Sequence, residues 1–275
     1  MSRNAWLRQF LSVAAILAAL SGGASLLSAQ WLNYPTAGVP RLANGKPNLA
    51  APAPRRADGK PDLSGIWQLE AACPPEGCAD YPAAPEFLNI AAKLKGGLPY
   101  QSWAADLVEK RAADLGRDDP VGRCRPAGAL RLLTFPPPRK ILHLPKLIVI
   151  LSERDVTYRQ IFTDGRPLPK DPDPSFNGFS TGRWQGDQLI VETIGFREGI
   201  WLDRKGNFIT EAAKMIERFH RVNYGRLEIE VTIDDLKAYT KPWTIKLNQL
   251  IQLDTELLDY YCLDNEKDAS HLVGK

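Results

Sequence analysis

From residue 140 onward, apolar and polar side chains alternate along the sequence with a period of two. The clearest case is the segment 226–233, where every second residue is Leu, Ile or Val and the residues between are charged or hydroxyl-bearing. This pattern is typical of an antiparallel sheet with one dry face and one wet face. Tight turns such as 185–187 separate the segments, so consecutive strands are expected to pair as hairpins.

About nine such strands are expected, with no helix long enough to cross over between them. Closing a meander of this kind into a barrel removes the open edges, so we expect a mainly β, antiparallel up-and-down barrel. A β-sandwich is the alternative. The expected strands are Ser64–Gln68, Ile141–Ser152, Val156–Thr163, Ser180–Trp184, Gln188–Ile194, Ala213–Val222, Leu227–Ile233, Trp243–Leu253 and Leu257–Cys262.

One amphipathic helix is expected near residues 100–116. Apolar residues recur there at helical spacing, Ser102 is a candidate cap, and Gly116 is placed to end the helix. The chain is therefore divided into a signal peptide (1–29), a proline-rich extended leader (30–62), and a single barrel domain (63–275) that carries this helix as an insertion.

The first 29 residues have the organisation of a secretory signal peptide. Arg3 and Arg8 precede an apolar run of about eleven residues, and small residues then lead to Ala29, the favoured cleavage position, with Ala24 as the second choice. A retained membrane anchor is the alternative, although glycines interrupt the apolar run. We therefore expect a periplasmic or secreted protein with no stable membrane span after cleavage.

The four cysteines agree with export, because thiols tend to pair in an oxidising space. Cys73 and Cys78 flank a short turn that can bring them together, which leaves Cys124 to pair with Cys262. We favour this pairing among the three that are possible. The histidines are scattered singly, so no metal site is expected.

Charge and motifs exclude several functional classes. The 35 Lys+Arg residues are nearly balanced by 32 Asp+Glu and form no blocks, so no nucleic-acid partner is expected. Phosphate-binding loops, dinucleotide fingerprints, serine-hydrolase elbows and zinc-protease motifs are absent from the sequence. We therefore expect a function without a cofactor.

The leader contains an imperfect duplication. The segment 43–50 (ANGKPNLA) returns as 57–64 (ADGKPDLS), at a spacing of fourteen residues. Two copies at this spacing indicate a duplicated turn and not a solenoid.

The segment 63–67 contains a Gly-x-Trp motif, Gly65 and Trp67, that resembles the start of lipocalins and other calycin barrels. In that resemblance the glycine permits close approach at the barrel end and the tryptophan plugs the base. A turn glycine before a core tryptophan is the alternative interpretation.

Longer strings resemble a family of exported, largely uncharacterised bacterial proteins. The resemblance implies a secreted β-rich domain and names no reaction. One departure is Ile209, where a histidine is expected before Thr210. The strings are Ala57–Trp67 (ADGKPDLSGIW), Tyr158–Pro167 (YRQIFTDGRP), Gly182–Thr193 (GRWQGDQLIVET) and the closing segment from Glu256 to Lys275.

Two glutamates are candidate proton-transfer residues. Glu192 shares a strand face with Ile190, and Glu217 lies between two apolar residues of its own face. A carboxylate on the dry face would have its pKa raised by desolvation and could act as a general acid or base. The alternatives are a structural ion pair with a neighbouring arginine such as Arg159 or Arg218, or a strand face that is simply wet.

Arginine and aromatic side chains are the candidate ligand-binding residues. Arg159 lies in a strand and is a candidate for binding an anion or a carbonyl group, with a surface-ladder arginine as the alternative. Indole and phenol rings near strand ends can line a cavity mouth, although core packing explains any one of them. The aromatic candidates are Tyr158, Trp184, Trp201, Trp243 and Tyr261.

Three functions remain open. The first is a calycin-like barrel that binds a small, mostly apolar molecule in its cavity. The second is a cofactor-free isomerase, lyase or cyclase on the same barrel, with a buried glutamate or tyrosine moving a proton. The third is a structural or envelope-interaction protein without a ligand cavity.

Overall fold

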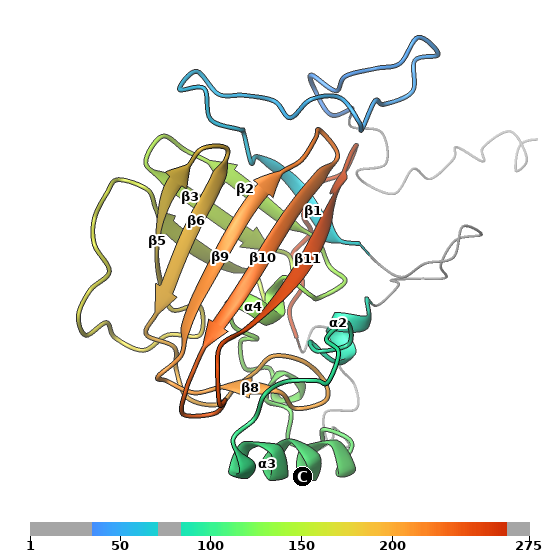
Figure 1. The fold of residues 1–275 in the computed structure, drawn as a ribbon. Coiled ribbons are helices and arrows are strands. Elements are labelled where there is room, and N and C mark those ends of the chain that lie inside the picture. Colours follow the sequence, from blue (N-terminus) through green and yellow to red (C-terminus); the bar gives the residue numbers. More distant parts are fainter. Residues whose placement is uncertain (1–34, 71–83, 263–275) are drawn as a thin grey trace, which may run out of the picture.

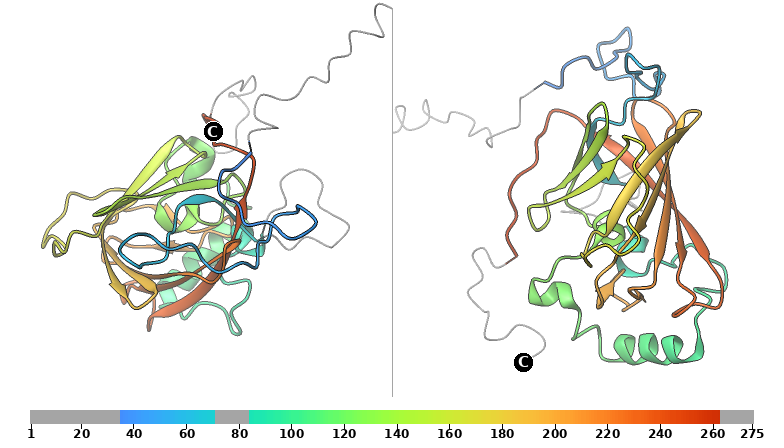
Figure 2. Two further views of the ribbon diagram at one scale, coloured as in Figure 1. Left: turned by 90° about the horizontal axis from the view of Figure 1, so that it is seen from above. Right: turned by 90° about the vertical axis from the view of Figure 1, so that its left-hand side faces the viewer.

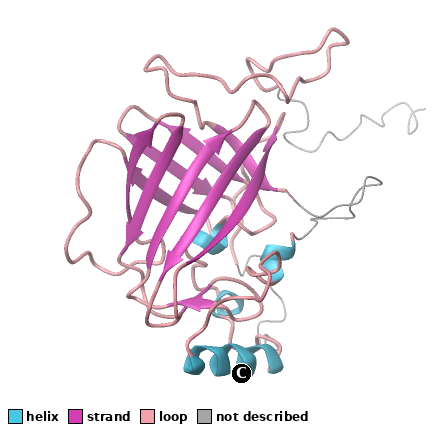
Figure 3. Ribbon diagram, viewed as in Figure 1, coloured by secondary structure: helices cyan, strands magenta, loops and turns pink. Residues whose placement is uncertain are grey.

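A computed structural model describes residues 35–70 and 84–262 as a closed β-barrel with several short helical segments (Figures 1 and 3). The expected signal peptide, the Cys73–Cys78 pairing and the closing residues lie outside the described part of the chain. The strands are β1 (Gly65–Leu69), β2 (Arg139–His143), β3 (Leu147–Ser152), β4 (Thr157–Phe162), β5 (Phe179–Gln185), β6 (Gln188–Ile194), β7 (Ile200–Trp201), β8 (Phe208–Ile209), β9 (Lys214–Arg221), β10 (Arg226–Asp234) and β11 (Trp243–Gln252).

The barrel closes in the order β1-β11-β10-β9-β6-β5-β4-β3-β2, and β1 pairs with β2 to complete the ring. The short strands β7 and β8 form a separate sheet in the excursion between β6 and β9. Otherwise each strand lies beside its neighbour in the chain. The expected β-barrel is therefore confirmed, and the β-sandwich is excluded.

One junction departs from the antiparallel pattern. Strands β4 and β5 run parallel, and they pair only where Ile161 meets Ser180 and Phe162 meets Thr181. A parallel pair needs a long connection, and the proline-rich loop 163–178 supplies it. The antiparallel pair β9–β10, by comparison, is in register from Leu227–Arg221 to Asp234–Lys214.

Two of the expected strands differ in the structure. The run expected as one strand over Ile141–Ser152 is divided into β2 and β3, because residues 144–146 form an exposed turn that contains Pro145. The expected strand Leu257–Cys262 does not form a ladder, and Tyr260 makes only an isolated bridge to Arg154.

The helix expected near 100–116 is confirmed as α3 (Ser102–Ala113), and it ends before Gly116, which has φ +67°. Ser102 is its first helical residue instead of its cap. Three shorter helical segments were not expected from the sequence. They are α2 (Pro85–Leu88), the 3-10 helix η1 (Pro120–Arg123) and α4 (Ala129–Leu132).

The interior of the barrel is filled with side chains. Met215, Val231 and Leu247 are fully buried in one hydrophobic cluster, and α4 adds Ala129 and Leu130 to it. A helix packed into the barrel core in this way plugs the barrel, so the expected dry face lines a solid core.

The end of the barrel opposite α4 is closed by the Gly-x-Trp segment 65–67. Trp67 is 1% exposed, its indole Nε1 donates to Leu63 O at 3.1 Å, and the Arg221 guanidinium lies 4.9 Å from its ring centroid. The leader 35–62 passes over this end of the barrel (Figures 1 and 2).

Candidate functional site

The disulfide between Cys124 and Cys262 is present, as expected, with Cα atoms 5.6 Å apart and a sequence separation of 138 residues. It ties the end of the described chain to the loop that follows η1. The preceding Tyr260 is thereby held beside Arg154 of the β3–β4 turn, and the Arg154 guanidinium lies 4.8 Å from the tyrosine ring centroid. The crosslink therefore places an aromatic wall next to the helical insertion.

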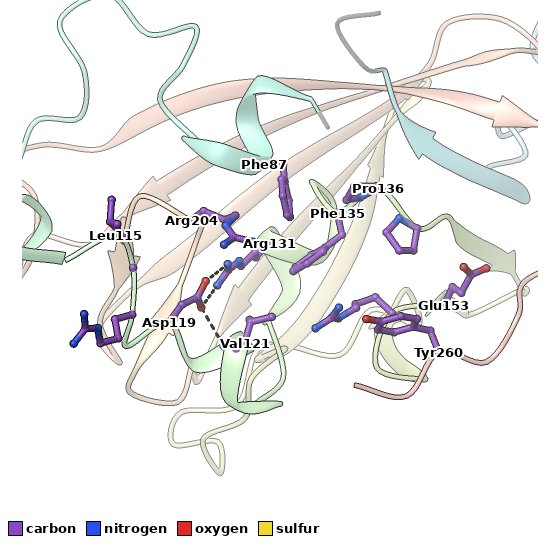
Figure 4. A pocket seen from close by; sticks show the side chains of 15 residues that line it. Phe87, Leu115, Asp119, Val121, Arg131, Phe135, Pro136, Glu153, Arg204 and Tyr260 are labelled. Carbon is purple, nitrogen blue, oxygen red and sulfur yellow. Dashed lines mark hydrogen bonds and ion pairs between the residues drawn. The ribbon is translucent and has the colours of Figure 1, made fainter. Parts of the chain in front are cut away.

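This wall belongs to a pocket of about 470 Å³ outside the barrel, which we call the base pocket (Figure 4). Its sides come from the insertion 85–137, the β3–β4 turn, the loop after β7 and the end of the chain. The residues that line it are Phe87, Leu115, Gly116, Arg117, Asp119, Val121, Gly122, Arg131, Phe135, Pro136, Pro137, Glu153, Arg154, Arg204 and Tyr260.

Apolar rings form one part of the pocket. Phe87 and Phe135 meet edge to face with centroids 5.2 Å apart, and Phe135 belongs to a small hydrophobic cluster separate from the barrel core. The Arg154 guanidinium lies 5.1 Å from the Phe135 centroid on one side and close to Tyr260 on the other. The pocket thus offers flat apolar surface next to cationic groups.

Arg131 fixes the floor of the pocket. Its side chain is 2% exposed and donates to both oxygens of Asp119, with Nη1–Oδ1 at 2.7 Å and Nη2–Oδ2 at 2.5 Å. Asp119 also accepts from Val121 N at the start of η1, at 3.0 Å. This bidentate pair is neutral overall, and it joins η1 rigidly to α4.

Arg204 lies at the rim of the pocket, and Figure 4 places it next to Phe87 and Arg131. Within residues 35–70 and 84–262 its guanidinium forms no ion pair, although its backbone N–H donates to Phe87 O at 3.4 Å. Arg154 and Arg117, by contrast, have carboxylate neighbours in Asp155 (3.0 Å) and Asp114 (3.7 Å). Arg204 therefore provides a positive charge that faces the pocket and that no carboxylate of the described residues balances.

Asp203 explains why Arg204 and Phe87 share a wall. Its carboxylate is fully buried and accepts backbone N–H groups from Ile90 (2.6 Å) and Gly206 (3.0 Å). Burial raises the pKa of this carboxyl, and the donated hydrogen bonds offset part of that effect. The contact joins the segment after α2 to the β7–β8 excursion.

The β3–β4 turn at the pocket edge has a strained backbone. Asp155 has φ +63° and Val156 has φ +44°, in the left-handed region that β-branched residues rarely adopt. Burial also raises the pKa of the Asp155 carboxyl, against the opposing effect of Arg154. The same turn carries Glu153 and Arg154, which line the pocket.

The two candidate catalytic glutamates lie on opposite faces of the sheet. Glu217 points into the barrel with no exposure, and both of its oxygens accept hydrogen bonds from Arg159. Glu192 faces outward, with Lys214 Nζ at 3.3 Å and Arg183 Nη1 at 3.7 Å. The structure therefore does not bring the two carboxylates into one site.

Arg159 connects four strands through its side chain. From β4, it donates to Glu217 on β9, to Ser180 Oγ on β5 at 3.1 Å and to Thr193 Oγ1 on β6 at 2.8 Å. These bonds cross the junction between β4 and β5, where the backbone ladder has only two residue pairs. We interpret the buried ion pair as a brace across that junction, where side chains replace missing backbone hydrogen bonds.

The void inside the barrel next to this brace has a volume of about 10 Å³, and it is lined by residues such as Arg139, Ser152 and Arg159. Such a volume holds one water molecule at most. This void is therefore too small for the ligand that the sequence led us to expect inside the barrel.

A second hollow of about 400 Å³ brings together two of the candidate binding residues, Tyr158 and Arg159. It lies beside the part of β4 that does not pair with β5, and its other wall is the segment 175–180. Most hydrogen-bonding groups of Arg159 are already used by the brace, so this hollow offers a ligand less than the base pocket does.

The remaining candidate aromatic residues are dispersed. Trp184 points inward and stacks on His143 at 5.6 Å between centroids, and Trp243 packs edge-on against Tyr239. Trp201 lies under the Arg111 guanidinium, 4.4 Å from it. Tyr261 is 57% exposed next to the disulfide, and Ile209, at the position where a histidine was expected, is buried in β8.

Sequence reasoning missed the base pocket, because its lining residues lie in loops, turns and very short helices. The pairing of Cys124 with Cys262 was the one signal that could have located it, since it brings the chain end to the insertion.

In the described residues no group of three or more His, Cys, Asp or Glu side chains gathers as metal ligands. No helix in the same residues has the length and apolar character needed to cross a bilayer. No protein-family model matches the chain, and no curated protein matches it.

Proposed function

We propose that this protein is an exported barrel that binds a small organic anion with an apolar, ring-bearing body in the base pocket. The observation that carries the proposal is the position of Arg204, which has no carboxylate partner in the described residues and lies beside Phe87 and Arg131 at the rim of a pocket of about 470 Å³. The ligand is mostly apolar, as the sequence led us to expect, but it lies at the base of the barrel and not within it.

The lining supports this class of ligand. Small-molecule pockets commonly measure roughly 300–1,000 Å³ and combine apolar walls with a few placed polar groups. Phe87, Phe135 and Tyr260 offer faces for a ring, while a guanidinium suits a carboxylate because it can donate two parallel hydrogen bonds. A carboxylate on an aromatic or cyclic body satisfies both features.

Binding is favoured over catalysis because the acids of the pocket are engaged. Asp119 is held by Arg131, and Glu153 accepts the backbone N–H of Leu258 at 3.0 Å. Both carboxylates that line the pocket thus already accept hydrogen bonds from groups of the chain itself. The cofactor-free isomerase, lyase or cyclase therefore remains the less supported proposal.

Export to the periplasm or beyond is part of the same proposal. It is supported by the signal-like first 29 residues, by the Cys124–Cys262 disulfide and by the resemblance to exported bacterial proteins. A structural role in the envelope is the alternative, and it predicts that the base pocket binds no small molecule.

The experiment is isothermal titration calorimetry of the purified protein with phenylacetate, cinnamate and indole-3-acetate, each paired with its uncharged amide. We expect at least one acid to bind, and its amide to bind roughly tenfold more weakly, because a charge-assisted hydrogen bond is lost. Replacing Arg204 by glutamine should weaken the binding of the acid by a similar factor.

The control is Arg183→Gln, which removes an exposed arginine from the outer face of β5, far from the pocket. Affinity should not change in this variant. Equal affinity for acid and amide, or full affinity in Arg204→Gln, would contradict the assignment of the anion to this arginine.

A further inference from the structure

The duplicated segment of the leader forms two loops with the same geometry. In each loop an arginine that follows a proline donates to a glycine carbonyl: Arg41 to Gly45 and Arg55 to Gly59, both at 2.8 Å. The structural repeat therefore runs from 40 to 50 and from 54 to 64. The matching backbone bonds are Leu42 N to Lys46 O and Arg56 N to Lys60 O, both 2.9 Å, and Asn48 N to Pro40 O and Asp62 N to Pro54 O, 2.7 and 2.8 Å.

The second loop docks on the barrel. Its Arg55 binds both oxygens of Asp187 in the β5–β6 turn, at 2.6 and 3.0 Å, and Lys60 Nζ donates to Gly186 O at 3.4 Å. Leu63, at the end of the loop, is fully buried in the core. The loop therefore clamps an acidic hairpin turn with two cations and anchors itself with one leucine.

The first loop has the two corresponding cations, but within the described residues they contact no turn like the one that holds Asp187. Leu42 and Leu49 are 47% and 45% exposed, and in the described part of the chain neither Arg41 nor Lys46 forms an ion pair. Only its base is fixed, since Gly225 N donates to Leu49 O at 2.9 Å. The loop projects beyond the end of the barrel (Figure 1).

The sequence differences between the loops make the first one more basic. Asp58 and Asp62 of the second loop correspond to Asn44 and Asn48 of the first, and Arg56 corresponds to Leu42, so the net charge rises from +1 to +2. The first loop thus keeps the two cations that clamp a turn and loses both carboxylates, which would repel an acidic partner.

We propose that the loop 40–50 is a docking element for an acidic β-hairpin turn of a partner protein. The contact between Arg55 and Asp187 serves as the template: Arg41 binds the carboxylate of the turn in bidentate fashion, and Lys46 binds the carbonyl of the preceding residue. The exposed Leu42 and Leu49 of the same loop offer apolar surface to the hairpin. The inference is independent of the base pocket, which lies at the opposite end of the barrel.

A partner other than a second copy is favoured, because the matching turn of this chain is already occupied. Asp187 is bound by Arg55 of its own chain, and a linked group has a high effective concentration at its site. An Arg41 from another copy would have to displace it.

The test uses a cyclised hairpin peptide that carries residues 183–190 and therefore the Gln-Gly-Asp-Gln turn. It is titrated into the purified ¹⁵N-labelled protein while amide resonances are followed by NMR. We expect weak, saturable shifts confined to residues 40–50, because exposed ion pairs contribute little free energy. The shifts should be lost in Arg41→Gln and with a peptide in which Asp187 is replaced by Asn.

A control variant, Arg218→Gln, removes an exposed arginine from the outer face of β9 and should leave the shifts unchanged. Absence of shifts, or equal shifts in Arg41→Gln, would overturn the proposal. Sedimentation of the protein alone tests whether the partner is a second copy of this chain. A dimer that is lost in Arg41→Gln would show that it is, and would overturn the proposal of a different partner protein.

Discussion

Arg159 and Glu217 are the residues whose roles the structure defines most sharply. A glutamate used only for proton transfer could be changed to glutamine with little effect on stability. Glu217→Gln instead leaves the Arg159 guanidinium as a buried charge without its counter-ion. We expect the variant to lose about 3–5 kcal/mol of unfolding free energy, measured by urea denaturation.

The double variant Arg159→Met, Glu217→Met is the matched control. Replacing both charges with apolar side chains of similar length removes the unpaired ion, so the double variant should be more stable than either single variant. A Glu217→Gln protein as stable as the parent would contradict the stabilising role of this ion pair and would favour a role for Glu217 in proton transfer.

At the level of single residues, the sequence left open which strand face lines the interior. Glu217 shares its face with Met215 and Phe219, and the structure shows that this face points inward. Glu192 shares a face with Ile190, which is 2% exposed although it lies outside the barrel. Arg183 and Arg218 flank Ile190 in register, and long basic side chains can cover an apolar neighbour. A buried isoleucine therefore did not indicate the interior.

Among the secondary-structure elements, the β3–β4 turn offers a direct test of strain. Val156 is 48% exposed and has φ +44°, so its side chain contributes strain without much packing. Val156→Gly should raise the free energy of unfolding by about 1 kcal/mol, because glycine adopts this conformation without a steric penalty.

The control is Val222→Gly. Val222 is an exposed valine, 42% accessible, at the end of β9, and its φ is not positive. There glycine adds only chain entropy to the unfolded state, so stability should fall slightly. If both variants lose the same stability, the turn is not strained.

Most strands were predictable because each has one dry face, and the alternation over 226–233 survives intact as β10. The predictions that differed were those without such a face. Pro145 interrupts an apolar run that reads as continuous, and the segment 257–262 is held by a disulfide and one bridge instead of a ladder. The short helices α2, η1 and α4 are too brief for a helical period to be visible.

For the whole molecule, the Cys124–Cys262 crosslink joins stability to the base pocket. It closes a loop of 138 residues, so replacing both cysteines by serine should cost about 2–4 kcal/mol of unfolding free energy. The same change releases Tyr260 from the pocket wall, and ligand affinity should fall with it. Denaturation and calorimetry on the variant measure the two effects separately.

An unchanged affinity in the serine variant would remove Tyr260 from the binding surface, even if stability fell. Substitution is preferable to a reductant, because a reductant would also break the disulfide that the sequence predicts between Cys73 and Cys78. Tyr260→Leu with the disulfide intact is the matched variant for the ring alone.

The overall architecture followed from the sequence because a barrel is a repeated local pattern. The pocket did not, because it depends on where four separate segments meet outside the barrel. Its location is decided by contacts such as Asp203 with Ile90, at 2.6 Å, between residues 113 positions apart. No periodic signal encodes a contact of that kind.

The short parallel junction has a consequence for how this protein fails. Because β4 and β5 pair over two residue positions only, the barrel resembles a sheet whose two edge strands, β4 and β5, are held together mainly by the Arg159 brace. Once this brace is broken, both edge strands expose unpaired N–H and C=O groups, and molecules can pair edge to edge into aggregates. We therefore expect loss of the Arg159 side chain to favour aggregation.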